Sequence, residues 1–131
     1  MAERGARLGL VILAVEDVPR ARSFYRAAFG WEPLVEVPVY TELGLSGGMR
    51  LGLYERRAFG ANTGRAPVAT PPGELAPTEL YFYPGDLEAT AVRLVAAGAR
   101  LLSPLARRAW GDEAAYYADL DGNVVVIARA G

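Results

Sequence analysis

The chain has 131 residues, with 14 basic and 15 acidic side chains and a formal net charge of -1. This length fits one domain, and the scattered arginines give no basic footprint for nucleic acid. The sequence contains no cysteine and no histidine, and every basic residue is arginine. These absences exclude cysteine nucleophiles, Ser-His triads, Schiff-base lysines and zinc sites of the Cys/His type. Any acid–base chemistry therefore falls to Asp, Glu, Tyr or water.

Hydrophobic residues make up 52% of the chain, but charged residues break the apolar runs well short of a membrane span. The first seven residues carry mixed charge and lead to no apolar core with a cleavage site. We therefore expect no membrane partner and a cytoplasmic location.

The first half begins with an apolar run at residues 8–15, followed by Glu16-Asp17. This pattern predicts a buried strand that leads into a helix capped by Asp17. Apolar residues then recur at helical spacing as far as Gly30, which sits where a left-handed C-terminal cap belongs. Three short strands are expected next, at Glu32–Val39, Tyr40–Leu45 and Arg50–Glu55.

Residues 56–77 differ in composition and are rich in Gly, Ala, Pro and Arg. The prolines discourage both a helix and a strand ladder. A loop of this length is unusual inside a compact domain, so the segment is predicted to be a linker between two halves or a lid over a site.

The second half repeats the first. A strand at Thr78–Tyr83 precedes a helix that is capped by Asp86 and ended by Gly98, and three strands follow at Ala99–Leu105, Ala114–Ala118 and Val124–Ala128. The predicted buried stripe of this helix is Leu87, Thr90, Ala91, Leu94, Val95 and Ala97.

The predicted fold is α+β, with two tandem βαβββ modules, of which module one spans about 7–55 and module two 78–130. A module of this size cannot bury both faces of its sheet alone. The modules are therefore expected to pair in a single domain, residues 1–131, as a curved mixed sheet around a central cleft with the helices outside.

Three stretches of the sequence resemble the vicinal oxygen chelate superfamily, which includes glyoxalases, bleomycin resistance proteins and extradiol dioxygenases. They are Val15-Glu16-Asp17 through Phe24-Tyr25-Arg26-Ala27-Ala28-Phe29-Gly30-Trp31, Asp86-Leu87 through Ala97-Gly98-Ala99, and Trp110-Gly111 through the turn Asp119-Leu120-Asp121-Gly122-Asn123. The resemblance spans nearly the whole chain. It implies the paired-module fold but does not choose among the activities of the superfamily.

Enzymes of this superfamily resemble one another in a metal site built from His, Gln or Glu. Carried over by resemblance, its four positions fall at Leu10, Glu79, Val126 and near Leu51. Three of these residues are aliphatic and offer a metal no donor atom. We therefore expect no metal and no cofactor, and a protein closer to the bleomycin-resistance branch.

Strand alternation places Leu10 and Ile12 on the cleft face with Glu79, Tyr81 and Tyr83. Glu79 is the candidate catalytic base or sole carboxylate ligand, although a solvated residue at a strand start is the plainer interpretation. The tyrosines and the two tryptophans are either walls of the cleft or ordinary core residues. The candidate ligand-binding residues are Leu10, Ile12, Trp31, Tyr40, Arg50, Leu51, Glu79, Tyr81, Tyr83, Trp110 and Val126.

The favoured function is metal-independent binding or sequestration of a small apolar or aromatic molecule. One alternative is a lyase, isomerase or dioxygenase relative that uses Glu79 as its base. A second alternative is an accessory domain whose apolar groove binds a protein segment. The resemblance also implies a homodimer.

Overall fold

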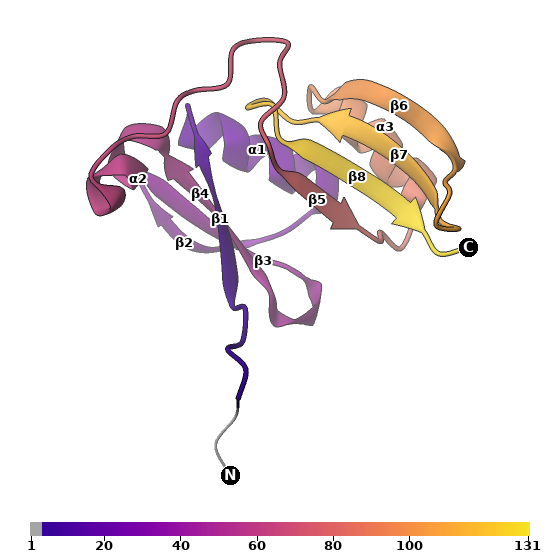
Figure 1. Cartoon of the computed structure of the whole chain (residues 1–131), viewed down its shortest axis with the longest axis horizontal. Coiled ribbons are helices and arrows are strands. Elements are labelled where there is room, and N and C mark those ends of the chain that lie inside the picture. The colour runs from indigo at the N-terminus through magenta and orange to yellow at the C-terminus, as the bar shows by residue number, and fades with distance from the viewer. Residues whose placement is uncertain (1–3) are drawn as a thin grey trace. The chain divides into compact units, whose positions relative to one another are not determined.

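The computed structural model describes residues 4–131 and confirms the α+β class. Each half contains a strand, a helix and three further strands, with an extra helix between the halves (Figure 1). The elements are β1 Leu10–Val15, α1 Val18–Phe29, β2 Pro33–Val37, β3 Tyr40–Gly44, the 3-10 turn Ser46–Gly48, β4 Arg50–Glu55, α2 Arg56–Thr63, β5 Glu79–Phe82, α3 Leu87–Ala96, β6 Arg100–Arg107, β7 Glu113–Ala118 and β8 Val124–Arg129.

The two sheets have the same topology. Their strand orders are β1-β4-β3-β2 and β5-β8-β7-β6, and neither sheet is closed. In each, the first and last strands of the half pair in parallel, and the other pairs are antiparallel. The predicted tandem repeat is therefore confirmed at the level of strand pairing. No helix of residues 4–131 is long and apolar enough to cross a membrane.

The chain divides into two compact units that do not coincide with the sequence modules. The first unit ends at Val18 and resumes over Trp31–Pro67, whereas the second contains Pro19–Gly30 and Val68–Gly131. Helix α1 therefore belongs with the sheet of the second half, although it lies in the first half of the sequence.

The core of the first unit is one face of its sheet. Leu13, Leu43, Leu51 and Leu53 are almost fully buried there, together with Thr41. Along β1 the buried residues alternate with more exposed neighbours, whereas the middle residues of β3 and β4 are buried on both faces.

Helix α2 contradicts the prediction that residues 56–77 lack regular structure. The Glu55 carboxylate accepts hydrogen bonds from the backbone N–H groups of Arg57 and Ala58, and Gly64 ends the helix in the left-handed conformation. Gly60 is required inside the helix because a Cβ there would lie 2.4 Å from Cα of Ala66. Packing and capping, rather than helix propensity, thus produce this helix.

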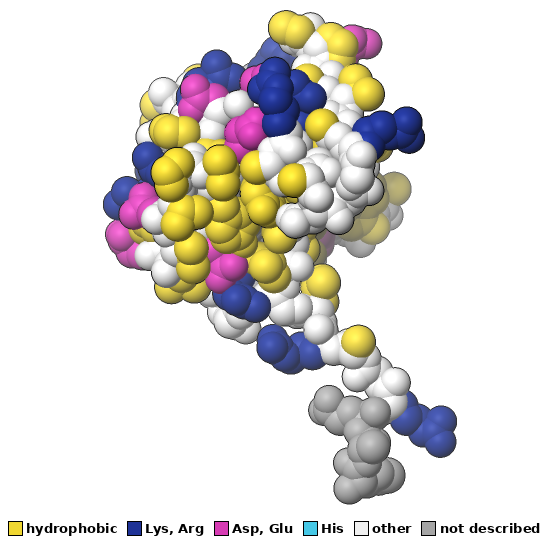
Figure 2. All heavy atoms as spheres, turned by 90° about the vertical axis from the view of Figure 1, so that its left-hand side faces the viewer, with side chains coloured by type: hydrophobic (Ala, Val, Ile, Leu, Met, Phe, Trp, Pro, Cys, Tyr) yellow, Lys and Arg dark blue, Asp and Glu magenta, His cyan; other side chains and the backbone are white. Residues whose placement is uncertain are grey.

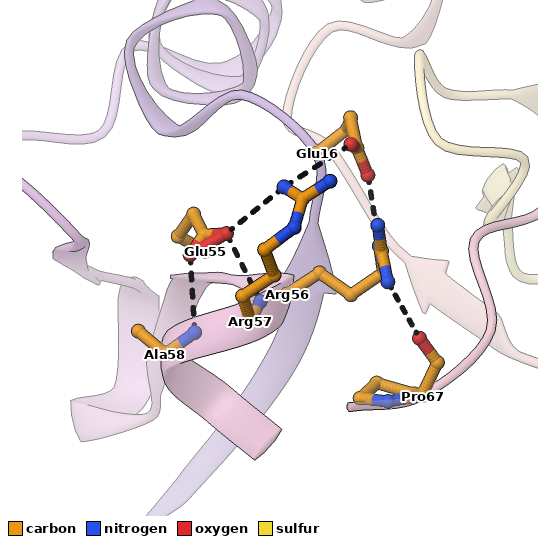
Figure 3. A network of polar contacts seen from close by, with 6 residues as sticks. All are labelled: Glu16, Glu55, Arg56, Arg57, Ala58 and Pro67. Carbon is orange, nitrogen blue, oxygen red and sulfur yellow. Dashed lines mark hydrogen bonds and ion pairs between the residues drawn. The ribbon is translucent and has the colours of Figure 1, made fainter. Parts of the chain in front are cut away.

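Two arginines fasten α2 to the end of β1 (Figure 3). Arg56 donates to Glu16 at 2.9 Å and to the carbonyl of Pro67 at 3.2 Å, while Arg57 lies within ion-pair distance of Glu16 and Glu55. The hydrogen bond from Arg56 lowers the pKa of Glu16. The first part of the predicted linker is therefore an anchored helix.

Helices α1 and α3 lie behind the second sheet in Figure 1. Phe29 of α1 contacts Phe82 of β5, and Arg93 of α3 donates to the carbonyl of Ala28. The buried side chains beneath them include Val125 and Ile127 of β8. This face of the second sheet is therefore the helix-covered one.

The predicted C-terminal ends of both helices and the cap of α3 are confirmed, whereas the Asp17 cap of α1 stays a prediction. The Asp86 carboxylate accepts from the N–H of Ala89 at the start of α3, and Gly30 and Gly98 have positive φ angles of 75° and 107°. Five of the six predicted stripe residues of α3 are buried or half-buried, but Val95 is 58% exposed. Val95 lies three residues after Val92, which is 71% exposed, so the two valines share the solvent-facing side of the helix.

The closing turn joins two of the sequence motifs that are far apart in the chain. Asp119 accepts hydrogen bonds from the hydroxyl of Tyr25 in α1 and from the backbone N–H groups of Asp121 and Asn123. Burial, then the neighbouring Asp119 charge, raises the pKa of Tyr25 well above its usual value. The carboxylate thus ties the turn to the helix.

The segment before β5 is held against this turn. Gly122 accepts a hydrogen bond from the N–H of Ala76, and a Cβ at Gly122 would lie 2.7 Å from the carbonyl oxygen of Glu74. Arg100 donates to the carbonyl of Gly73 at 3.1 Å. The role of this segment as a lid stays a prediction.

Candidate functional site

Strand register assigns the predicted site residues of the first unit to one face, which we call the Tyr40 face. Leu10 pairs with Arg50, Ile12 with Gly52 and Ala14 with Tyr54, and β3 adds Glu42 and Tyr40 opposite Gly52 and Tyr54. Paired residues point to the same side of a sheet. Leu10, Ile12, Tyr40 and Arg50 therefore lie on one face of this sheet, and their role in binding a ligand stays a prediction.

A buried carboxylate organises the Tyr40 face. Glu42 is only 8% exposed; it accepts a hydrogen bond from the Tyr40 hydroxyl at 2.7 Å and pairs with Arg50 at 2.9 Å. Arg50 also donates to the carbonyl of Gly9. Burial, then the bond to Glu42, raises the pKa of Tyr40 well above its usual value, so the hydroxyl stays protonated.

Leu51 is misplaced by the sequence prediction. It lies on the opposite, buried face, at 2% exposure, because adjacent residues of a strand point to opposite sides. In the register, Ile12 pairs with Gly52 as Tyr81 pairs with Val126. The repeat counterpart of Val126 is therefore Gly52, one residue later.

The space beside Gly52 is already filled by its neighbours. A Cβ at this position would lie 2.5 Å from the Tyr40 hydroxyl oxygen and 2.9 Å from Cγ1 of Ile12. The tyrosine hydroxyl thus occupies the volume that any side chain at residue 52 would enter.

Aromatic rings extend the Tyr40 face toward α2. Tyr40 and Tyr54 lie 5.1 Å apart between ring centroids, and Tyr54 lies 6.0 Å from Phe59 of α2, both in edge-on arrangements. Asn62 of α2 donates to the Tyr54 hydroxyl at 3.3 Å. Sequence reasoning missed Phe59 and Asn62 because it placed no helix there.

The corresponding face of the second sheet, the Tyr81 face, carries Tyr81 of β5, Val124 and Val126 of β8, and Tyr116 of β7. Val126 is fully buried, with Tyr81 and Tyr116 packed against its cluster. Glu79 pairs with Val124 at the start of β5, and its side chain is exposed. The candidate base is therefore in water rather than in an apolar setting.

Three predicted site residues, Tyr81, Tyr83 and Trp110, lie around Asp112, which the sequence reasoning missed. We call these four residues the Asp112 cluster. Both tyrosine hydroxyls donate to Oδ2 of Asp112, at 2.7 and 2.8 Å, and the indole N–H of Trp110 donates to the Tyr81 hydroxyl at 2.9 Å. The two tyrosine rings meet edge-on at 5.5 Å. The only sequence signal for Asp112 was its place two residues after Trp110.

The cluster perturbs the ionisation of its members. Hydrogen bonds from Tyr81 and then Tyr83 lower the pKa of Asp112, because they stabilise the carboxylate. The bond to Asp112, and then burial, raise the pKa of Tyr83 to about 12. At neutral pH the cluster is therefore one carboxylate surrounded by neutral hydrogen-bond donors.

Trp31, the remaining predicted residue, is half-buried at the start of the first unit's second segment.

The residues at the four positions that the resemblance assigns to metal ligands do not fit a metal ion. With the register correction, they are Leu10 and Gly52 in the first unit and Glu79 and Val126 in the second. Three of these four have no donor atom in their side chains. Within residues 4–131, no group of three or more Asp, Glu, His or Cys side chains is placed to hold a metal.

Known proteins share this fold. A glyoxalase-related enzyme from Fulvimarina pelagi has a TM-score of 0.81 at 25% identity, covering 93% of this chain and 86% of its own. A protein of unknown function from Agrobacterium tumefaciens str. C58 scores 0.79 at 25% identity, covering 98% of both chains. Lactoylglutathione lyase from Agrobacterium tumefaciens scores 0.70 at 21% identity, covering 96% of this chain and 95% of its own, a likeness that shows the fold alone.

No curated protein sequence matches this chain. The family description Glyoxalase/Bleomycin resistance protein/Dioxygenase superfamily, however, matches residues 7–127, which is nearly the whole sequence. The shared fold, the paired βαβββ order and this match agree. The chain belongs to the Glyoxalase/Bleomycin resistance protein/Dioxygenase superfamily.

Proposed function

We propose that this protein binds and sequesters a small aromatic or largely apolar molecule without a metal ion, as a bleomycin-resistance-like member of its family. The observation that carries the proposal is the set of side chains at the four metal-ligand positions. Leu10, Gly52 and Val126 offer no donor, and the exposed Glu79 alone supplies too few ligands for a stable site.

Aromatic rings supply the binding surface. Tyr83 is 62% exposed and Trp110 is 58% exposed, yet hydrogen bonds to Tyr81 and Asp112 fix their positions. Ordering exposed rings before a ligand arrives lowers the entropy cost of binding. Planar molecules gain both apolar burial and ring stacking from such a surface.

The first test is metal analysis of protein purified without chelator. We expect less than stoichiometric Ni, Zn, Fe and Mn. One bound metal per chain, retained after dialysis, would contradict the metal-independent proposal and favour the enzyme alternative based on Glu79.

The second test is a thermal-shift screen with planar aromatic antibiotics and aromatic metabolites. A ligand present at 100 times its Kd stabilises the folded state by about 2.7 kcal/mol. Tyr83→Ala should abolish the shift, whereas Val92→Ala, at a residue 71% exposed on α3, should leave it unchanged. If no compound stabilises the protein, sequestration is wrong.

We also propose that the protein is a homodimer. Four apolar side chains on and just after the edge strand β2, namely Leu34, Val35, Val37 and Val39, are 42–60% exposed. Figure 2 shows hydrophobic side chains gathered on the side of the molecule where β2 and α2 lie. An apolar edge strand exposed to water favours association between chains.

Sedimentation should give twice the monomer mass for the wild type. Val37→Glu should give a monomer. A wild-type protein that is monomeric at all concentrations would contradict the proposal.

A further inference from the structure

The Asp112 cluster presents aromatic rings around a carboxylate whose charge is not neutralised. Within residues 4–131, Asp112 forms no ion pair, and its hydrogen bonds come from the two tyrosine hydroxyls and the backbone N–H of Gly131. Its side chain is nevertheless largely buried, with the residue 9% exposed. A partly desolvated negative charge of this kind attracts a cation more strongly than one in open water.

The arginines nearest in sequence are engaged elsewhere. Arg107 donates to the carbonyl of Gly111 at 3.1 Å. Arg108 donates to the carbonyls of Pro104 and Ala114, and its guanidinium lies 4.9 Å from the centroid of the Tyr116 ring. Neither side chain supplies the positive charge that Asp112 lacks.

The rings complement the carboxylate. Tyr81 and Tyr83 donate to Asp112, and Trp110 donates to the Tyr81 hydroxyl, so the orientation of the three rings is fixed relative to the charge. Aromatic faces attract cations through the ring quadrupole, and the indole of Trp attracts them most strongly. Their exposure, 62% for Tyr83 and 58% for Trp110, leaves ring surface open to a ligand.

We infer that the Asp112 cluster binds an organic cation, of the alkylated ammonium class, either free or as one group of a larger ligand. This inference rests on the proposed small-molecule function and names the chemistry of one part of the ligand. The carboxylate neutralises the charge, and the rings replace the water around the alkyl groups. An anion would be repelled by the Asp112 carboxylate, and a neutral apolar group would gain no electrostatic attraction from it.

The probe is choline, compared with 3,3-dimethylbutan-1-ol, which has the same shape without the charge. The chain has only two tryptophans, so the indole N–H signal of Trp110 is readily followed by NMR. We expect choline to shift this signal in a saturable way, at a Kd in the millimolar range typical of fragments. The neutral alcohol should bind at least about tenfold more weakly, which corresponds to about 1.4 kcal/mol.

Variants separate the charge from the rings. Asp112→Asn keeps an acceptor for the tyrosine hydroxyls but removes the charge, and should weaken choline binding about tenfold. Glu74→Gln is the matched control, because it removes one exposed carboxylate from the same unit; it should have no effect. Tyr83→Leu, at a position 62% exposed, should weaken choline binding about two- to fivefold.

Three results would overturn the inference. The first is equal binding of choline and the alcohol, and the second is choline binding that Asp112→Asn leaves unchanged; the proposed sequestration of neutral ligands would survive either of them. The third is no shift of the Trp110 signal at choline concentrations up to about 100 mM. The function itself fails only if the separate aromatic screen also finds no ligand.

Discussion

Replacing Tyr25 by Phe tests the contact between the first helix and the closing turn. The Tyr25 side chain is 1% exposed, and its hydroxyl donates to the buried carboxylate of Asp119. Phe keeps the ring, which meets Phe24 edge-on at 4.9 Å and stacks on Phe29 at 6.3 Å. The substitution therefore removes one hydrogen bond without creating a cavity.

The expected loss of unfolding free energy is about 1.5–3 kcal/mol, the range for a hydrogen bond to a charged group. Asp119 keeps its bonds to the N–H groups of Asp121 and Asn123 and to the Asn123 amide, so it is not left without partners. For a chain of this size the loss corresponds to a fall in Tm of roughly 5–15 °C.

The assay is urea and thermal unfolding of the wild type, Tyr25→Phe and a control, Tyr117→Phe. Tyr117 is 5% exposed, and its hydroxyl makes no hydrogen bond within the described residues. Its loss should change stability by less than about 0.5 kcal/mol. Equal effects of the two substitutions would refute the role assigned to the Tyr25–Asp119 bond.

The same substitution has a pH signature. Burial and the Asp119 charge raise the pKa of Tyr25 in the folded state, whereas the unfolded tyrosine ionises near pH 10. The native state therefore holds one more proton above pH 10, and stability falls there by about 1.4 kcal/mol per pH unit for this group. Tyr25→Phe should reduce that slope by one proton; an unchanged slope would contradict the assignment.

Three further substitutions test local packing and capping. Asp86→Ala removes the cap of α3 and should cost about 1 kcal/mol in urea unfolding. Gly52→Ala should lower the free energy of unfolding by about 1–3 kcal/mol because its Cβ would clash with the Tyr40 hydroxyl. The loss should be smaller in a Tyr40→Phe background, and additive effects of the two substitutions would refute that contact. Gly122→Ala combines a φ of 85° with a clash against the Glu74 carbonyl and should cost about 2–4 kcal/mol, so a stability equal to the wild type would contradict the turn geometry.

Local signals predicted most of the elements. Asp86, Gly30 and Gly98 mark helix ends because the capping atoms and the positive φ angles depend on a few neighbouring residues. Alternation predicted which face each strand residue takes, given the register. The repeat of β-α-β-β-β followed from aligning the two caps, and the strand pairing confirms it.

Errors arose where an element depends on particular contacts rather than on residue periodicity. Helix α2 has a weak local pattern and forms through the Glu55 cap and the close approach of Gly60 to Ala66. The grouping of α1 with the second unit depends on contacts with residues some fifty or more positions away, such as Phe82. No local pattern carries that information.

The candidate site was predicted unevenly for the same reason. Tyr81, Tyr83 and Trp110 were chosen as candidate walls of the cleft, but Asp112, which orders them, was not, because its tyrosine partners lie 29 and 31 residues earlier. Leu51 was chosen without a register, and an error of one residue in a strand moves a side chain to the other face. The expected cytoplasmic location and the enzyme alternative stay predictions.

The strand β8 shows why the family is easier to read from the sequence than the function. Val125 and Ile127 point to the face covered by α1 and α3, whereas Val126 points to the Tyr81 face. Helix α1 is the one that Tyr25 ties to the closing turn. The residues of the helix-covered core therefore alternate along one strand with the residue at the metal-ligand position. Val126 is itself fully buried, in a cluster with Ala114 and Ala128, so a substitution there also changes the packing of the Tyr81 face. Family membership thus follows from one set of positions, and the absence of metal donors from the other.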